Sequence, residues 1–182
     1  MPAGAPLRHP EPPPRDGDVI LRAWRPDDVA AVAAFGLDAD NVRFGDVAAG
    51  RREGEAAAYL AAMERMRREG RGLSFAVADA ATDTVLGTLD LRFPYPRVGE
   101  LGYLLDPAAR GRGTMTRAVR LAIEWAFADL ELARVQAFVS PDNARSMRLL
   151  ERLGFAREGL LRSYRGPGAD RVAYAVLAGD LR

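Results

Sequence analysis

Cysteine is absent from the 182 residues, and histidine occurs once, as His9. Without cysteine the chain has no disulfide, no thiolate nucleophile and no thiolate metal site, which fits a reducing cytosol. No metal is expected, because the single histidine lies in a proline-rich N-terminal segment. No apolar run approaches the roughly 20 residues of a membrane span. The formal net charge of +1 does not indicate a nucleic acid or a membrane surface as partner.

The N-terminal segment and the remainder of the chain differ in composition. Residues 1–17 are rich in proline and contain no apolar stretch of the kind that a signal peptide needs, so they are predicted to be a disordered tail. Residues 18–182 are expected to form a single domain. A chain of this length buries about 70% of the surface of its unfolded state and needs no disulfide or metal for stability.

Hydrophobic periodicity divides residues 18–182 into strands and helices. Strands are predicted at 19–24, 73–78, 85–93, 98–105, 134–139, 156–164 and 171–177. Helices are predicted from Pro26 to Phe35, at 53–69, over a face that contains Ala118 and Trp125, and at 144–153, while residues 36–50 are expected to be irregular. One strand–helix–strand unit with parallel strands among antiparallel ones predicts an α/β fold, with a mixed, mostly antiparallel sheet flanked by helices.

A short basic loop, Arg110-Gly111-Arg112-Gly113, joins the strand at 98–105 to the helix that follows. The first N–H groups of a helix have no intrahelical partner and carry the positive end of its dipole, so they attract an anion. Glycines let the backbone approach a phosphate closely and adopt positive φ. The loop therefore predicts a site for one diphosphate-sized ligand at residues 110–116.

Three short motifs follow this strand in order, and together they resemble those of the GNAT acyl-CoA transferases. They are Arg110-x-x-Gly113 after Leu105-Asp106-Pro107, then Asn143-x-x-Ser146, then Leu153-Gly154-Phe155. The chain is most similar to the RimJ and RimL branch, which acetylates the amino termini of ribosomal proteins, and the similarity begins at Val19. It implies a GNAT fold and an acetyl-CoA-dependent N-acetyltransferase that uses no metal.

The resemblance also implies a coenzyme A site. Its pyrophosphate residues are Arg110, Gly111, Arg112, Gly113, Thr114, Met115 and Thr116, which bind mainly through backbone N–H groups. The family usually has a small residue where Met115 stands, a departure that is expected to narrow the loop without removing backbone binding. Pantetheine is expected to pair with the backbone near Leu104 and Leu105. Asn143 is expected to cap the next helix and to bond a pantetheine amide, with a cap alone as the alternative.

Acyl transfer also needs a neutral amine and a proton for the departing thiolate. The resemblance implies Ser146 as the proton donor, because Leu150 stands where many members carry a tyrosine; a plain helix-surface hydroxyl is the alternative. Glu100 is the first candidate for the base and Asp170 the second, since the glutamate that the RimL branch has in its last hairpin is missing here. An ordinary surface charge fits Glu100 equally well.

The sequence predicts acetyl transfer by direct attack in a ternary complex, because no cysteine and no Ser-His pair is present to carry an acyl group. The partners are a coenzyme A ester and an amine. The amine is expected to be a protein or peptide N-terminus, with a small amine such as an amino acid, polyamine or antibiotic as the alternative. A non-catalytic acyl-CoA-binding module is a further alternative, and a monomer and a homodimer both fit the sequence.

Overall fold

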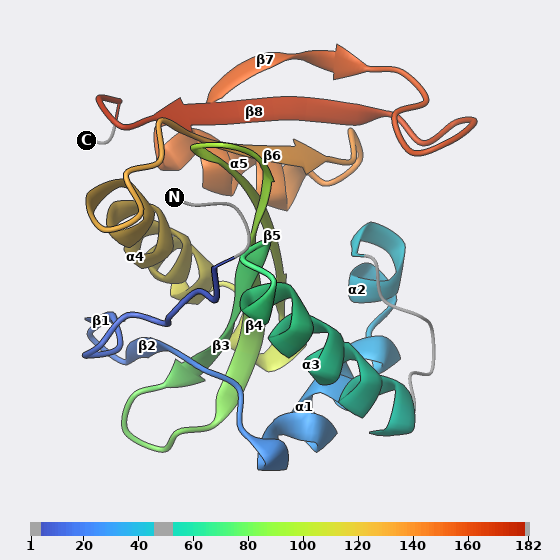
Figure 1. Cartoon of the computed structure of the whole chain (residues 1–182). Coiled ribbons are helices and arrows are strands. Elements are labelled where there is room, and N and C mark those ends of the chain that lie inside the picture. Colours follow the sequence, from blue (N-terminus) through green and yellow to red (C-terminus); the bar gives the residue numbers. More distant parts are fainter. Residues whose placement is uncertain (1–4, 46–52, 181–182) are drawn as a thin grey trace.

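The computed structural model describes residues 5–45 and 53–180 (Figure 1). Within these residues one sheet has eight strands in the order β1-β2-β3-β4-β5-β6-β8-β7. The strands are β1 (Arg15–Asp16), β2 (Val19–Arg22), β3 (Gly72–Asp79), β4 (Val85–Tyr95), β5 (Val98–Leu105), β6 (Arg134–Val139), β7 (Ala156–Leu161) and β8 (Arg171–Leu177). The helices are α1 (Val29–Ala34), α2 (Ala39–Phe44), α3 (Glu53–Arg68), α4 (Thr114–Ala128) and α5 (Ala144–Arg152).

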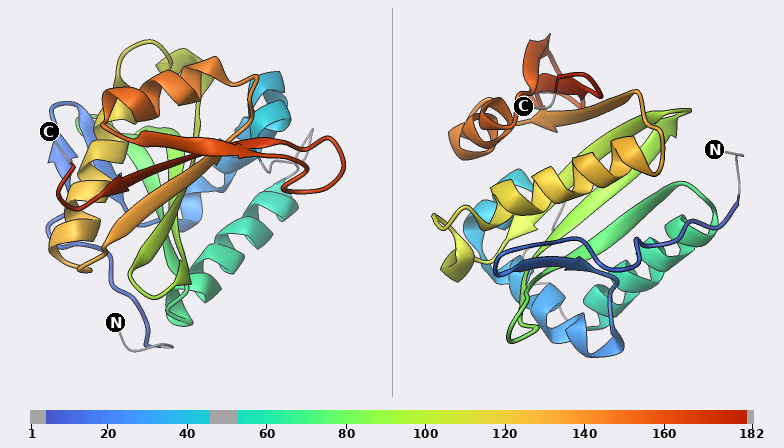
Figure 2. Two further views of the ribbon diagram at one scale, coloured as in Figure 1. Left: turned by 90° about the horizontal axis from the view of Figure 1, so that it is seen from above. Right: turned by 90° about the vertical axis from the view of Figure 1, so that its left-hand side faces the viewer.

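Helices cover both faces of the sheet. α4 lies on one side, and α1 and α3 lie on the other (Figures 1 and 2). β3 is consequently buried along almost its whole length, which explains its nearly unbroken apolar sequence. Phe75, Ile123 and Leu150 are fully buried in the main core, which joins β3, α4 and α5. The predicted α/β class with a mixed, mostly antiparallel sheet is confirmed.

The parallel pairing of β5 with β6 ends early. β5 runs from Val98 to Leu105, but it pairs with β6 only through Val98, Gly99 and Glu100. α4 makes the crossover between these two strands, as predicted from the sequence. Residues 101–105 of β5 therefore keep their backbone partner on the β4 side alone. This parting of two neighbouring strands positions the site described below.

The prediction of a disordered tail over residues 1–17 is wrong for residues 5–17. Leu7 is buried, and its backbone N–H donates to the carbonyl of Arg67 on α3. His9 donates from Nε2 to the Ser74 carbonyl across 3.0 Å and packs edge-on against Phe75. The packing of Leu7 and of the His9 ring against the core holds this segment in place without an apolar run. The composition of the segment does not reveal this packing.

Several element boundaries also differ from the sequence prediction: β2 ends at Arg22 and β4 extends to Tyr95. Part of the stretch expected to be irregular forms α2, which begins because the Asp38 side chain accepts a hydrogen bond from the Asn41 N–H. Residues 46–50 of that stretch lie outside the described residues. β7 ends at Leu161, three residues earlier than expected, because the chain turns at Ser163, whose N–H donates to Asp170 across 2.8 Å.

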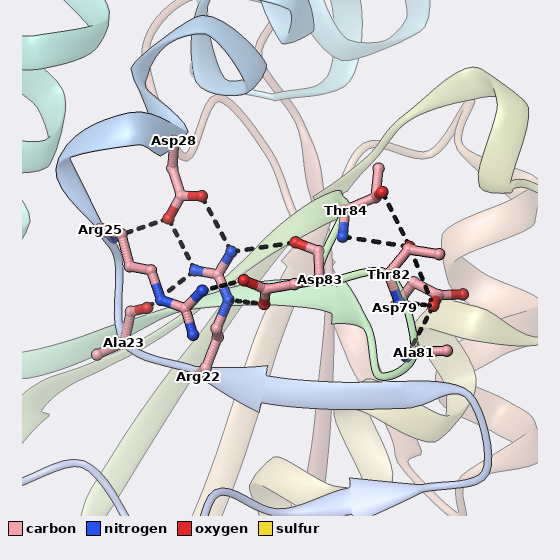
Figure 3. A network of polar contacts seen from close by, with 9 residues as sticks. All are labelled: Arg22, Ala23, Arg25, Asp28, Asp79, Ala81, Thr82, Asp83 and Thr84. Carbon is pink, nitrogen blue, oxygen red and sulfur yellow. Dashed lines mark hydrogen bonds and ion pairs between the residues drawn. The ribbon is translucent and has the colours of Figure 1, made fainter.

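A buried ion pair ties the first helical turn to the sheet (Figure 3). The Arg22 guanidinium donates to both carboxylate oxygens of Asp28, at 2.8 and 3.0 Å, and to Asp83 at 2.7 Å. Arg22 and Asp28 are almost completely buried. Burial alone raises the pKa of Asp28, but hydrogen bonds from Arg22 and from the Arg25 backbone outweigh it and hold that pKa below its usual range.

Replacing Arg22 with methionine is expected to lower the free energy of unfolding by about 3 kcal/mol at pH 7, because Asp28 would stay buried without its cation. Since the pKa of Asp28 is lowered in the fold, the pair stabilises the protein above the unfolded-state pKa of about 3.9 and loses this effect as the pH falls through the lower folded value. Urea denaturation at pH 7 and pH 3 tests this. The difference between variant and wild type should shrink at pH 3.

Arg25→Met is the matched control, because the Arg25 side chain is 57% exposed and its ion pair with Asp83 lies in solvent. It should cost less than about 1 kcal/mol. If both variants lost the same free energy of unfolding, the buried ion pair would stabilise the protein no more than the exposed one.

Candidate active site

A large cleft opens where β5 and β6 part, with a cavity volume of about 1170 Å³. Its walls come from α1, α2, α3, β4, β5, the loop before α4, β6, α5 and the β7–β8 hairpin. Of the residues expected at a site, it is lined by Glu100, Leu104, Leu105, Arg110, Gly111, Gly113, Thr114, Met115, Thr116, Asn143 and Ser146. Arg112 is exposed outside this lining. The fold thus brings residues of β5, the glycine loop and the Asn143-x-x-Ser146 motif to one cavity, whereas Leu153-Gly154-Phe155 lies outside its lining.

The loop before α4 has the geometry of an anion site. Gly111 and Gly113 have φ of 79° and 74°, in the left-handed region that side chains disfavour. A Cβ placed on either glycine would meet no atom within 4 Å, so the space above both is open. Gly113 is the N-cap of α4, and the N–H groups of the first helical turn have no intrahelical acceptor. The backbone can therefore receive a phosphate here.

Arg110 lies in the cleft wall, but its guanidinium is engaged by α2. It donates to the Asp38 carboxylate, to Asn41 Oδ1 at 3.2 Å and to the Leu105 carbonyl at 3.2 Å, and it lies 3.4 Å from Asp40. The hydrogen bond from Arg110 is the main cause that lowers the pKa of Asp38. Arg110 thus fastens the loop to α2, so the backbone N–H groups are the donors of this loop that could bind an anion.

Met115 does not obstruct the loop. Its side chain is buried in the main core together with residues of the sheet and of α4, as expected for an apolar residue in the first turn of an amphipathic helix. Thr114 is also buried. The departure from the family pattern at Met115 is therefore accommodated in the core.

Asn143 and Ser146 lie one turn apart at the start of α5. The Asn143 side-chain oxygen accepts from the Ser146 N–H at 3.1 Å, which confirms the predicted cap. The amide NH2 of Asn143 is left as the group that can donate to a ligand. The Ser146 hydroxyl lies 2.6 Å from the hydroxyl of Tyr103 on β5. Leu150, one turn further, is fully buried in the core.

Tyr103 lies within the strand predicted at 98–105, and no functional role was predicted for it from the sequence. Burial raises its pKa to about 12, although the hydrogen bond with Ser146 acts in the opposite direction. The hydroxyl therefore keeps its proton at neutral pH and can donate it to Ser146. The signal for this role was the strand period: alternate residues of β5 face opposite sides, so Tyr103 faces away from Glu100 and Gly102.

The two candidate bases lie in different places. Glu100 lines the cleft on β5, and its Oε1 lies 3.9 Å from the Arg165 guanidinium of the last hairpin. Asp170 lies outside the cleft lining and accepts the Ser163 N–H, so it has a structural role in the hairpin turn. Of these two carboxylates, only Glu100 is placed beside the cleft.

Residues 5–45 and 53–180 contain no group of three or more histidine, cysteine, aspartate or glutamate side chains that could bind a metal ion. No helix within these residues is long and apolar enough to cross a membrane.

Residues 18–156 match the family described as acetyltransferase (GNAT) domain. The chain belongs to this family. A curated GNAT relative, the probable N-acetyltransferase YjcK of Bacillus subtilis (strain 168), is 36% identical over 135 residues, which cover 70% of this chain and 74% of the relative. The GNAT family and the N-acetyltransferase class predicted from the sequence are both confirmed.

Solved GNAT structures share the fold over nearly the whole chain. Mycobacterium smegmatis RimJ, in complex with CoA-disulfide, superposes with a TM-score of 0.79 and 25% identity, covering 90% of this chain and 83% of RimJ. The apo structure of RimL, a ribosomal L7/L12 α-N-protein acetyltransferase, superposes with a TM-score of 0.81 and 19% identity, covering 90% of this chain and 92% of RimL. The RimL likeness concerns the fold alone.

Proposed function

We propose that this GNAT protein acts in the cytosol and transfers the acetyl group of acetyl-CoA to the N-terminal amine of a peptide or protein, by direct attack in a ternary complex. One observation carries the proposal. The glycine-lined start of α4 and the Tyr103–Ser146 hydroxyl pair open into one cleft at the parting of β5 and β6. A phosphate group and a thioester of one long ligand can be held there together.

Coenzyme A is held mainly by backbone in this proposal. Its pyrophosphate lies against residues 111–116, and its pantetheine arm pairs with the free side of β5 at Leu104 and Leu105. Asn143 donates its amide NH2 to a pantetheine carbonyl. The proposal is supported by the RimJ neighbour, which was solved with CoA-disulfide. Arg112 is left out, because it lies outside the cleft lining.

The leaving group receives its proton from Ser146. The neutral amine attacks the carbonyl carbon of the thioester, the C–N bond forms and the nitrogen loses a proton to a base in the cleft. The C–S bond breaks, and the thiolate takes the serine proton. Tyr103 then donates its own proton to Ser146 across the 2.6 Å hydrogen bond and regains one from solvent. The serine can act as an acid because a second hydroxyl restores its proton.

The charge and size of the cleft favour a peptide over a polycation. Among the described residues its lining has the arginines Arg43, Arg92, Arg110, Arg145, Arg148, Arg152, Arg165 and Arg171 and the carboxylates Asp40, Asp90, Glu100 and Asp142. A polyamine or aminoglycoside would meet an excess of positive charge. The cavity volume of about 1170 Å³ exceeds that of a typical small-molecule pocket, so it leaves room for a peptide end beside pantetheine.

The test is a panel of acceptors incubated with protein and acetyl-CoA. The panel contains peptides with the N-terminal sequences of bacterial ribosomal proteins, free amino acids, spermidine and kanamycin. Coenzyme A release measures turnover, and mass spectrometry locates the acetyl group. The expected result is acetylation of peptide α-amines with little turnover of spermidine or kanamycin. If spermidine or kanamycin is acetylated in preference to the peptides, the acceptor is a small polycation and not a peptide. If acetyl-CoA binds but no member of the panel is acetylated, the protein is better described as an acyl-CoA-binding module.

Replacing Tyr103 with phenylalanine is expected to lower the turnover number about tenfold, a modest part of the range for acid–base groups. The ring still fills its place in the strand, while Ser146 loses the donor that restores its proton. The fold should be retained, and the dissociation constant for acetyl-CoA should stay within twofold of the wild-type value. Initial rates measure the turnover number, and a binding titration measures the affinity. An unchanged turnover number would show that Ser146 needs no second hydroxyl.

A further inference from the structure

Asp90 on β4 is a buried carboxylate that the mechanism above does not use. It is 7% exposed, and it lines the cleft. Charged side chains are rarely buried to this degree without a cationic partner at short distance. The nearest cation here, Arg92 Nη2, lies 3.5 Å from Asp90 Oδ2 and is itself well exposed.

Neutral hydroxyl donors hold this carboxylate in place. Tyr59 on α3 donates to Asp90 at 3.2 Å, and Thr88 donates at 3.4 Å. Behind them the Trp24 indole N–H donates to Ser74 at 2.8 Å, which leaves the serine proton to point toward the same group. Burial raises the pKa of Asp90, although these hydrogen bonds and Arg92 act against it. Glu100 lies on the same face of β5 as Gly102, and its Oε1 lies 3.9 Å from the Arg165 guanidinium; the cleft lining also contains Asp40, Arg43 and Arg171.

The space beside Asp90 is open toward the place where the thioester must lie. Asp90 pairs with Gly102 of β5, and paired residues of an antiparallel ladder put their side chains on the same face. A Cβ on Gly102 would meet no atom within 4 Å. The pairing of β5 with β6 ends at Glu100, and Gly102 lies two residues further along β5. An amine resting on Gly102 would therefore face Asp90 on one side and the opening between the strands on the other.

We propose that Asp90 is the general base of this acetyltransferase, and that the acceptor amine lies over Gly102 between Asp90 and the opening of the sheet. This inference rests on the proposed function and assigns to Asp90 the role that was predicted for Glu100 from the sequence. Ser146 and Tyr103 serve the leaving group from the opposite face of β5.

The proton balance of the reaction closes with this assignment. Asp90 removes one proton from the acceptor ammonium and releases it to solvent, and the free amine attacks the acetyl carbonyl. As the C–S bond breaks, the nitrogen gives its second proton to Asp90, and the thiolate takes one proton from Ser146, which Tyr103 and solvent replace. Asp90 then releases the second proton to solvent, so an ammonium and acetyl-CoA give an amide, coenzyme A and one proton.

Asp90→Asn tests the base through its pH profile. The Tyr59 and Thr88 hydroxyls can still donate to the side-chain oxygen of the new asparagine, so the fold should be retained. A thermal melt checks this. In the wild type the rise of kcat/KM with pH should lie below the pKa of the acceptor's own amine, about 7.7 to 8.0. In Asp90→Asn the rate at pH 7 should fall about 100-fold, and the rise should move up to the pKa of the free amine. A merely structural role would lower the rate equally at every pH.

Glu100→Gln is the matched comparison, because it removes the other carboxylate on the same face. It should keep the wild-type profile and lose less than about tenfold in rate. If Glu100→Gln instead moves the rise and Asp90→Asn does not, Glu100 is the base and the proposal is overturned.

Gly102→Val tests the location of the amine without turnover. Valine suits a strand, and open space surrounds this position, so the fold should be retained. The probe is coenzyme A joined through an acetyl linker to the N-terminus of a peptide. The wild type should bind this conjugate more tightly than coenzyme A, and Gly102→Val should weaken the conjugate at least tenfold while free coenzyme A changes less than twofold. Equal binding of conjugate and coenzyme A by the wild type would overturn the placement.

These outcomes separate the two claims. A wild type that binds the conjugate through Gly102 but acetylates no member of the panel refutes the proposed function and leaves the amine site in place. A wild type that acetylates peptides, with an unaltered pH profile in Asp90→Asn, refutes Asp90 as base and leaves the function in place.

Discussion

Replacing Gly113 with valine is expected to weaken acetyl-CoA binding at least 100-fold, equivalent to about 3 kcal/mol. Gly113 has φ of 74°, where a β-branched side chain is strained by roughly 1–2 kcal/mol or more. A valine would either fill the open space above the loop or force the backbone out of the left-handed region. In both cases the N–H groups at the start of α4 lose their approach to phosphate. Dissociation constants from thermophoresis, with thermal melts to confirm folding, test this.

Gly54→Ala is the control for the glycine change itself. Gly54 lies in the first turns of α3, has no positive φ and has open space around it, so alanine should be neutral or slightly stabilising. Its affinity for acetyl-CoA should equal that of the wild type. If Gly113→Val folds and also keeps wild-type affinity, the phosphate does not lie at this loop.

Replacing Ser146 with alanine is expected to lower the turnover number about 100- to 1000-fold while leaving acetyl-CoA affinity within twofold. The thiolate would depart without a proton donor. The cap from Asn143 is retained, because it uses the Ser146 backbone N–H and not the hydroxyl. The loss should therefore appear in kcat and not in the stability of α5. Steady-state kinetics and a parallel binding titration separate the two effects.

Ser163→Ala provides the matched serine control, since Ser163 is exposed on the last hairpin and takes part there through its backbone N–H. Its kinetics should be those of the wild type. An unaltered turnover number in Ser146→Ala would remove the serine from the chemistry and reduce it to a hydroxyl on the helix surface.

The elements that local patterns specify were predictable from the sequence. The strand at 98–105, the glycine loop and the amphipathic α4 follow one another within about 30 residues, so periodicity and turn chemistry were sufficient. Asn143 as a cap was predictable for the same reason. α2 was missed because it has only six residues, and the packing of Leu7 was missed because it depends on one buried side chain.

The chemistry of the cleft depends on contacts between distant segments, which no local pattern contains. Arg110 looked like a phosphate ligand in the sequence, but Asp38, 72 positions earlier, engages it in the fold. Asp90 lies within the strand predicted at 85–93, where no local pattern indicated a catalytic role, and only the meeting of β4 with α3 reveals its hydroxyl donors. The partner of Ser146 was hidden likewise, because Tyr103 lies 43 positions away.

The central claim is that the start of α4 binds the diphosphate of coenzyme A, with the thioester beside Ser146. Isothermal titration of acetyl-CoA into the wild-type protein tests it most directly. The expected result is one site per chain with a dissociation constant in the micromolar range, about −8 kcal/mol. A titration with no binding heat at millimolar acetyl-CoA at two temperatures would contradict the account.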